Sequence, residues 1–209
     1  MWLEGLGLTR KAMPYRQNMN THLLFRITIF FVLGITSCKS DYQKMVEKEL
    51  SSGKQVDELF LGLKLGMTRK EFYETCWELN KEGVLTNGPT ELSVEYDAAL
   101  PSGNTAKMRF YPKFEDDQLY LMPVEFTYLG WAPWNEELSA ENLRSDVVSL
   151  LQDWYNTEFI EVANEDKSLL AYVSVEGNRR VRIFKKHLSV VRVEIVDLKV
   201  LQKIEEEPS

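Results

Sequence analysis

Apolar positions from residue 59 onward alternate between a helical spacing and a strand spacing, and the helical spacing comes first. Thr68 and Glu71 form a T-x-x-E capping box, which is typical of a helix start, and Gly83 suits the residue just past its end. The apolar face of this helix repeats at Phe72, Cys76 and Leu79. Residues 59–65, just before it, are mostly apolar and fit either a buried strand or an irregular buried segment.

Alternation of apolar and polar residues predicts three strands after this helix, over residues 92–96, 106–110 and 118–128. Pro101 and Gly103 indicate a hairpin turn between the first two. Pro123 lies inside the third strand and cannot donate a backbone hydrogen bond. It therefore indicates a β-bulge or an edge position.

The same order of elements returns about seventy residues later along the chain. Ser139 is a candidate N-cap for a second amphipathic helix. Its apolar positions are Leu143, Val147, Leu150, Leu151 and Trp154. Strands are predicted over residues 169–175, 180–184 and 188–196, followed by a charged tail. We expect an α+β domain over residues 57–209, built from two tandem helix-plus-antiparallel-sheet units at residues 57–134 and 135–209.

The most apolar stretch of the chain, residues 27–35, precedes this domain and follows Arg26. It is about half of the roughly 20 residues that a membrane-spanning helix needs, so a signal peptide is favoured over a permanent transmembrane helix. The junction Ile35-Thr36-Ser37-Cys38 resembles the lipobox of bacterial lipoproteins. That resemblance implies cleavage of residues 1–37, lipid attached to Cys38, and localisation at the outer membrane, facing the periplasm or the cell surface.

Two further expectations concern the N-terminal region. A start at Met1 gives an unusually long basic segment before the apolar run, and translation from Met19 or Met13 would give a more ordinary signal. Residues 38–56 are polar and contain Ser51-Ser52-Gly53, so they are interpreted as a tether with a helical turn or two around residues 42–50.

Charge is distributed unevenly between the signal and the rest of the chain. From Cys38 onward there are 21 basic and 31 acidic residues, a net charge of −10. An acidic body without a concentrated basic stripe argues against binding to nucleic acid, whose phosphates require clustered Lys and Arg. It also argues against electrostatic docking on anionic lipid, so membrane attachment is expected through the lipid on Cys38.

Candidate catalytic and metal-binding residues are few. Cys76 has no cysteine partner once Cys38 is lipidated, and its place on an apolar helix face indicates a buried thiol. His187 is the one histidine after Cys38, so an ordinary zinc site is excluded and no cofactor is expected. Carboxylates such as Asp116, Asp117 and Glu125 leave a glycosidase-type acid pair open, although acids on a solvated face are far commoner.

Two groups of residues are candidates for binding a partner. Trp131 and Trp134 surround Gly130 and Pro133 and form either an exposed aromatic shelf or a plug between the two units. Arg180 and Arg182 alternate with apolar neighbours and share one strand face. That face is either a solvated surface that balances the acidic body or a contact for an acidic partner.

The stretch Leu63-Lys64-Leu65-Gly66-Met67-Thr68-Arg69-Lys70-Glu71-Phe72 resembles the helix opening of the small OmlA-type outer-membrane lipoproteins. That family has a helix-then-sheet fold and assists the insertion of outer-membrane barrels. The β-lactamase-inhibitor-protein fold, with two such units in tandem, is similar in element order. Here the helix is longer than the family pattern and the chain after the anchor about twice as long.

The sequence therefore favours a lipid-anchored, non-enzymatic binding or assembly module for an envelope protein partner. The alternative is a lipid-anchored hydrolase that cuts envelope glycan or peptide with a carboxylate pair. Inhibition of a secreted enzyme is a third hypothesis, which rests on the fold resemblance. A deep cleft with two carboxylates would favour the hydrolase, and a sheet exposing Trp131 or Trp134 would favour binding.

Overall fold

A computed structural model describes residues 39–90, 93–164 and 169–207. The predicted signal peptide, residues 1–37, and the predicted lipidation site Cys38 lie outside the described residues. The described helices are α2 (Asp41–Ser51), α3 (Arg69–Lys81), the 3₁₀ helix η1 (Glu136–Leu138), α4 (Ala140–Tyr155) and α5 (Leu198–Glu206). The strands are β1 (Thr86–Asn87), β2 (Val94–Ala99), β3 (Thr105–Phe110), β4 (Lys113–Glu115), β5 (Gln118–Tyr128), β6 (Ile160–Ala163), β7 (Leu170–Glu176), β8 (Arg179–Lys185) and β9 (Val191–Asp197).

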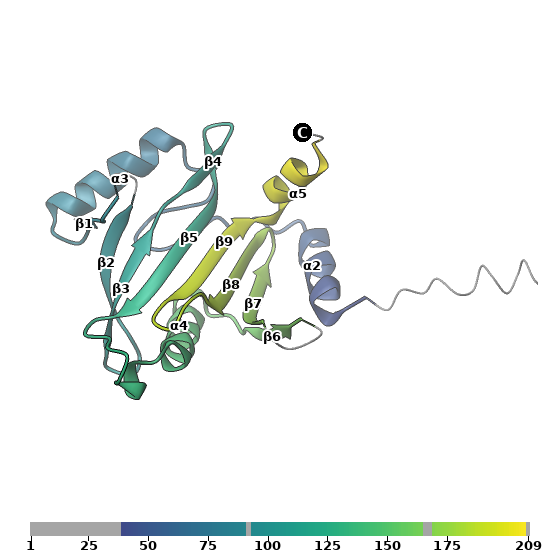
Figure 1. The fold of residues 1–209 in the computed structure, drawn as a ribbon. Helices are drawn as coiled ribbons and strands as arrows, with labels where there is room; N and C mark the ends of the chain where they lie inside the picture. Colours follow the sequence, from purple (N-terminus) through teal and green to yellow (C-terminus); the bar gives the residue numbers. More distant parts are fainter. Residues whose placement is uncertain (1–38, 91–92, 165–168, 208–209) are drawn as a thin grey trace, which may run out of the picture. The chain divides into compact units, whose positions relative to one another are not determined.

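These strands form one antiparallel sheet in the order β1-β2-β3-β5-β9-β8-β7-β6, with β4 paired to one end of β5 (Figure 1). The expected α+β class is therefore confirmed. The last strands of the two strand groups pair with each other, from Leu121 opposite Val196 to Phe126 opposite Val191. The strands of both predicted units thus belong to a single continuous sheet.

Both predicted helix starts are confirmed by their capping hydrogen bonds. The Thr68 hydroxyl accepts from the backbone N–H of Glu71, and the Glu71 carboxylate accepts from the Thr68 N–H at 2.8 Å. Ser139 caps α4. Gly83 follows α3 with a φ of +76°, a left-handed conformation that glycine adopts at little cost. These short-range interactions explain why the helices begin and end where the sequence predicts.

All six predicted strands are found among the described residues, and three short strands were not predicted. β3, β5, β7, β8 and β9 lie within a few residues of their predicted limits. β2 matches the first predicted strand, whose first residue, Leu92, lies outside the described residues. The strands without a prediction are β1, β4 and β6, which have two to four residues each. Residues 59–65 form an irregular buried segment and not a strand, with one isolated bridge between Glu58 and Lys64.

The edge position predicted for Pro123 is wrong, because β5 is a central strand between β3 and β9. The backbone carbonyl of Pro123 accepts from the Tyr111 N–H, just where β3 ends and before β4 begins. In an antiparallel pair the nitrogen of a residue points to the same side as its carbonyl. The missing N–H of Pro123 therefore faces a gap in the ladder, where it costs little.

The region expected to be a polar tether contains helix α2, which begins with a capping box between Ser40 and Gln43. Apolar side chains of α2 pack over Val173 and Val175 of β7. They are Tyr42, Met45, Val46 and Leu50. The helical turns expected around residues 42–50 are thus part of the folded domain rather than a free linker.

The main core lies between the sheet and α4, which contacts β5, β8 and β9. Its largest fully buried side chains include Phe72, Phe110 and Phe126. Cys76 is buried in the same core, and burial raises the pKa of its thiol to about 12. A thiol in this state is protonated and unreactive, as expected for a structural cysteine. Within the described residues, no helix has the length and apolar character needed to cross a bilayer.

Arg179 is a buried cation, 3% exposed, that joins three parts of the fold. Its guanidinium donates to the backbone carbonyl of Glu58 at 2.7 Å and to the Glu176 carboxylate at 2.8 Å. It also lies 4.1 Å from the ring centroid of Tyr155 at the end of α4. The residues before α3, the β7–β8 turn and α4 are therefore held together by one side chain.

Arg179→Ala is expected to lower the free energy of unfolding by about 3 kcal/mol, because it removes charged hydrogen bonds and a buried cation–π contact. Urea unfolding followed by circular dichroism measures this change. Arg182→Ala, on the same strand, is the matched control and should cost below about 1 kcal/mol, because its ion pair is partly exposed. Equal losses in the two variants would contradict the role assigned to Arg179.

Candidate binding surface

On the side of the sheet away from α4, side chains near the middle of β2, β3, β5 and β9 are only partly buried. This part of the sheet is called the open face below. Its side chains follow the strand register. Glu95 lies opposite Arg109, Arg109 opposite Glu125, and Glu125 opposite Arg192. These four residues, here called the charged row, alternate in sign across four adjacent strands.

The charged row is held by short ion pairs. Arg109 Nη2 lies 2.7 Å from Glu95 Oε1, and Arg192 Nη1 lies 2.7 Å from Glu125 Oε1. Lys186 Nζ, from the β8–β9 turn, lies 2.6 Å from the same Glu125 oxygen. Burial disfavours the Glu125 anion, but the hydrogen bonds and charges of Lys186 and Arg192 outweigh burial and lower the pKa of Glu125.

A pocket of about 390 Å³ lies at one end of the open face. It is lined by Trp131 and the chain that leaves β5, together with three members of the charged row, Glu95, Arg109 and Glu125. Its lining residues are Glu95, Lys107, Arg109, Glu125, Thr127, Tyr128, Leu129, Gly130 and Trp131. The pocket therefore combines charges of both signs with two aromatic residues, Tyr128 and Trp131.

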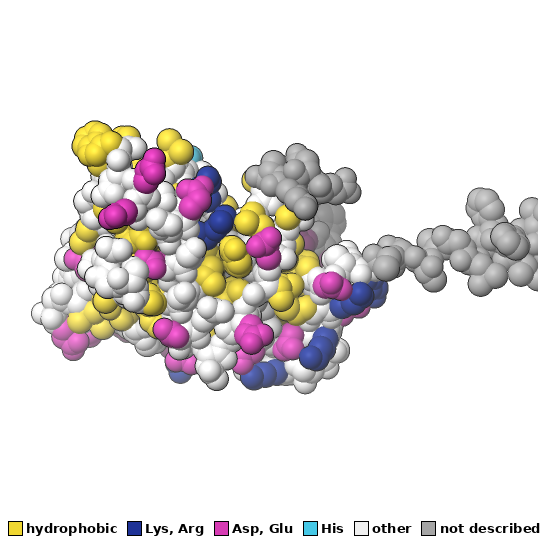
Figure 2. All heavy atoms as spheres, turned by 90° about the horizontal axis from the view of Figure 1, so that it is seen from below, with side chains coloured by type: hydrophobic (Ala, Val, Ile, Leu, Met, Phe, Trp, Pro, Cys, Tyr) yellow, Lys and Arg dark blue, Asp and Glu magenta, His cyan; other side chains and the backbone are white. Residues whose placement is uncertain are grey.

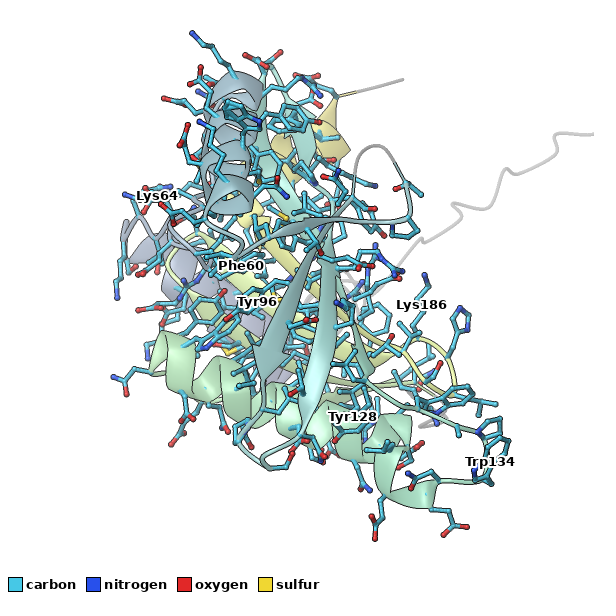
Figure 3. The ribbon with its side chains drawn as sticks, turned by 90° about the vertical axis from the view of Figure 1, so that its left-hand side faces the viewer. Phe60, Lys64, Tyr96, Tyr128, Trp134 and Lys186 are labelled. Atoms are coloured by element: carbon cyan, nitrogen blue, oxygen red, sulfur yellow. The ribbon has the colours of Figure 1, made fainter. Side chains whose placement is uncertain are left out.

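The two tryptophans predicted as a shelf or a plug have different surroundings. Trp131 is half-buried and packs against the main core while it lines the pocket. Trp134 is 85% exposed and lies at the outer end of the loop after β5, on the same side of the sheet as Lys186 and opposite to Phe60 and Lys64 (Figure 3). Trp131 thus packs against the core and also contributes an aromatic surface to the pocket. Trp134 is neither buried between elements nor part of the pocket.

Arg180 and Arg182 share one face of β8, as predicted, but neither lines the pocket. Arg180 donates to the Tyr42 hydroxyl of α2 at 3.0 Å. Arg182 Nη2 lies 2.6 Å from Glu194 Oε2, and its guanidinium lies over the Phe184 ring. Both cations are therefore paired within the domain, and of the four predicted binding residues only Trp131 belongs to this surface.

The sequence did not predict that the four residues of the charged row come together. Glu95, Arg109 and Arg192 come from strands far apart in the chain, and their alternation in sign exists only across the sheet. A cross-strand pattern of this kind requires the register, which sequence periodicity along one strand does not supply.

Glu95 and Glu125 are the carboxylates that share this pocket, and they test the hydrolase alternative. They lie on strands separated by β3, so about two strand spacings, roughly 9.6 Å, separate their backbones. A general acid requires a carboxyl group whose pKa is raised, whereas the pKa of Glu125 is lowered. Glu95 is likewise paired, with Arg109. The surroundings of both acids therefore favour stable ion pairs over proton transfer.

The other candidate groups for chemistry have structural surroundings. Asp116 and Asp117 make the β4–β5 turn, and Asp117 lies 3.7 Å from Arg69. His187 lies in the β8–β9 turn. Across residues 39–90, 93–164 and 169–207, no three side chains among His, Cys, Asp and Glu are grouped to hold a metal ion.

No protein-family model, curated protein or solved structure matches this chain.

Glu125→Gln is expected to lower the free energy of unfolding by about 1–2 kcal/mol at neutral pH, because it removes a charge that Lys186 and Arg192 stabilise. A lowered pKa adds stability that is complete above the ordinary glutamate value of 4.5 and is lost as the pH falls through the lowered value. The difference from wild type should therefore shrink below about pH 4. Urea unfolding between acid and neutral pH measures it.

Glu74→Gln, on the exposed surface of α3, serves as the control for this experiment. Its ion pair with Lys70 is long, at 3.8 Å, so the variant should unfold with nearly wild-type stability at every pH. A pH-independent loss in Glu125→Gln would mean that packing, and not charge, accounts for the effect.

Proposed function

We propose that the protein is a lipid-anchored component of the bacterial envelope that binds a protein partner on the open face around Trp131. The anchor follows from the lipobox at residues 35–38 and the apolar run before it. The OmlA-type resemblance favours an envelope assembly component as the partner, at an outer membrane and on either its periplasmic or its outer side. No enzymatic activity is assigned to the domain.

The observation that carries the proposed binding role is the pocket where Trp131 meets the charged row. A half-buried tryptophan beside arginine is a typical centre of a protein interface, because its large ring buries area with little loss of conformational freedom. The ring of Trp131 is also held by the core, so it is oriented before binding. Such preorganisation lowers the entropy cost of association.

The charges around the pocket define the partner's chemistry. Glu95, Arg109, Lys107 and Glu125 alternate in sign over a short distance, so a complementary partner carries both signs around an apolar side chain. A uniformly acidic partner is disfavoured by the net charge of −10 from Cys38 onward. This alternation favours specificity over strong long-range attraction.

We also infer that residues 57–134 and 135–209 are two similar units. Each begins with a helix, α3 or α4, and continues into a meander whose last strand is β5 or β9. The pairing of β5 with β9 would then be the junction of the two units, and the charged row would be an interface feature that neither unit has alone.

Protein isolated from its native membranes is expected to start at Cys38 and to carry acyl chains, and intact-mass measurement checks both features. Cys38→Ser should remove the added mass, because the acyl chains are attached through that thiol. An unmodified Cys38 in the wild-type protein would overturn the anchor and the assigned compartment.

Trp131→Ala is expected to weaken capture of the partner at least tenfold, which corresponds to a hot-spot loss of about 1.4 kcal/mol or more. A photo-crosslinking residue at Thr127, inside the pocket, identifies the partner in cells, and the same residue at Glu74 on α3 is the negative position. Trp77→Ala is the matched control, since Trp77 is exposed on α3. Equal crosslinking from both positions would contradict a specific surface.

A further inference from the structure

Several loops lie together at one end of the sheet, as its register shows. Phe126 of β5 lies opposite Val191 of β9, so the chain after β5 runs beside the β8–β9 turn. Ala171 of β7 lies opposite Phe184 of β8, so the start of β7 is at this end too. Residues 129–134, residues 186–190 and Leu169 are called the loop end below.

Large apolar side chains are exposed at the loop end. Leu129, Trp134, Leu169 and Leu188 are exposed by 47%, 85%, 70% and 79%. A single exposed apolar side chain is ordinary, but three leucines and a tryptophan exposed on neighbouring loops indicate a contact surface. Figure 2 views the molecule from below Figure 1 and shows apolar side chains interspersed with acidic and basic ones. The three other large apolar side chains exposed among the described residues, Tyr73, Trp77 and Trp154, belong to α3 and α4.

The direction of α2 relates the loop end to the anchor. The C-terminal part of α2 is fixed at the opposite end of the sheet, where the Gly177 N–H donates to Glu49 and Lys54 pairs with Glu176. The 11 residues of α2 span about 16 Å, and its N-terminal end points away from the β7–β8 turn (Figure 1). The chain therefore enters the domain on the side of the loop end.

The link between this point and the lipid is short. Cys38 comes two residues before Ser40, the N-cap of α2, and two residues extend by no more than about 7 Å. A lipid on Cys38 would therefore keep the start of α2 close to the bilayer surface.

We propose that the loop end lies in the headgroup region of the membrane that holds the Cys38 lipid, with Trp134 inserted. This inference rests on the anchor in the proposed function. Tryptophan favours that region because its ring is apolar and its N–H can still donate a hydrogen bond. The leucines add apolar area, and Lys185 and Lys186 come three and two residues before Leu188 in the sequence. The acidic body requires an apolar contact of this kind, since charge alone would not attract it to anionic lipid.

The lipidated full-length protein, reconstituted in phosphatidylcholine vesicles with brominated acyl chains, tests this inference through tryptophan fluorescence. Bromine quenches a nearby indole, so the emission of the wild-type protein should fall relative to vesicles without bromine. Trp134→Phe should lose at least half of this quenching. Trp77→Phe is the matched control and should retain it, because Trp77 lies on α3 and outside the loop end.

The other possible results would overturn the inference. Quenching that persists in Trp134→Phe, or that disappears only in Trp131→Phe, would overturn the inference, because Trp134 would then not be the ring that lipid contacts. No quenching with Cys38 shown to be lipidated by mass would overturn this inference alone. An unmodified Cys38 would overturn the proposed anchor and the membrane contact together.

Discussion

The antiparallel pairing of β5 with β9 is the contact on which the rest of the structure depends. It joins strands about seventy residues apart and turns two meanders into one sheet. Glu125 and Arg192 meet across this pairing, and Lys186 reaches Glu125 from the turn before β9. Both strands also contact α4 and contribute side chains to the core beneath it. Without this pairing, neither the charged row nor the loop end would exist.

The open face shows how a sheet can leave one side uncovered without exposing a large apolar surface. Over β7, where the outward side chains are Val173 and Val175, α2 covers the sheet. Along the charged row of the central strands the outward side chains alternate in sign, so each ionic group has a partner on a neighbouring strand. Opposite charges across strands stabilise the pairing modestly, and they leave the surface polar. In the pocket beside Trp131, aromatic surface and paired charges of this face meet.

Local interactions were predictable from the sequence, and long-range ones were not. The capping residues Thr68 and Ser139 determine their helix starts through groups within three residues, so the pattern was sufficient. The packing of α2 on β7 depends on the distant Val173, and the tolerance of Pro123 depends on where β3 happens to end. The same limit applies to the site: Trp131 was identified by its neighbours in sequence, but its ionic partners required the register. Arg180 and Arg182 share a face as expected, yet their pairing within the domain makes them structural.

A membrane contact at the loop end would also determine how the open face is presented. The strands run toward this end, so a domain resting on it would hold the sheet upright and the open face sideways to the bilayer. A partner at Trp131 would then approach along the membrane, within reach of proteins embedded in the same leaflet. Lateral approach confines both molecules to two dimensions and to one orientation, which reduces the entropy cost of a small interface. In this arrangement the small number of residues between Cys38 and Ser40 would itself matter for function, because a long tether would let the domain tumble and lose that orientation.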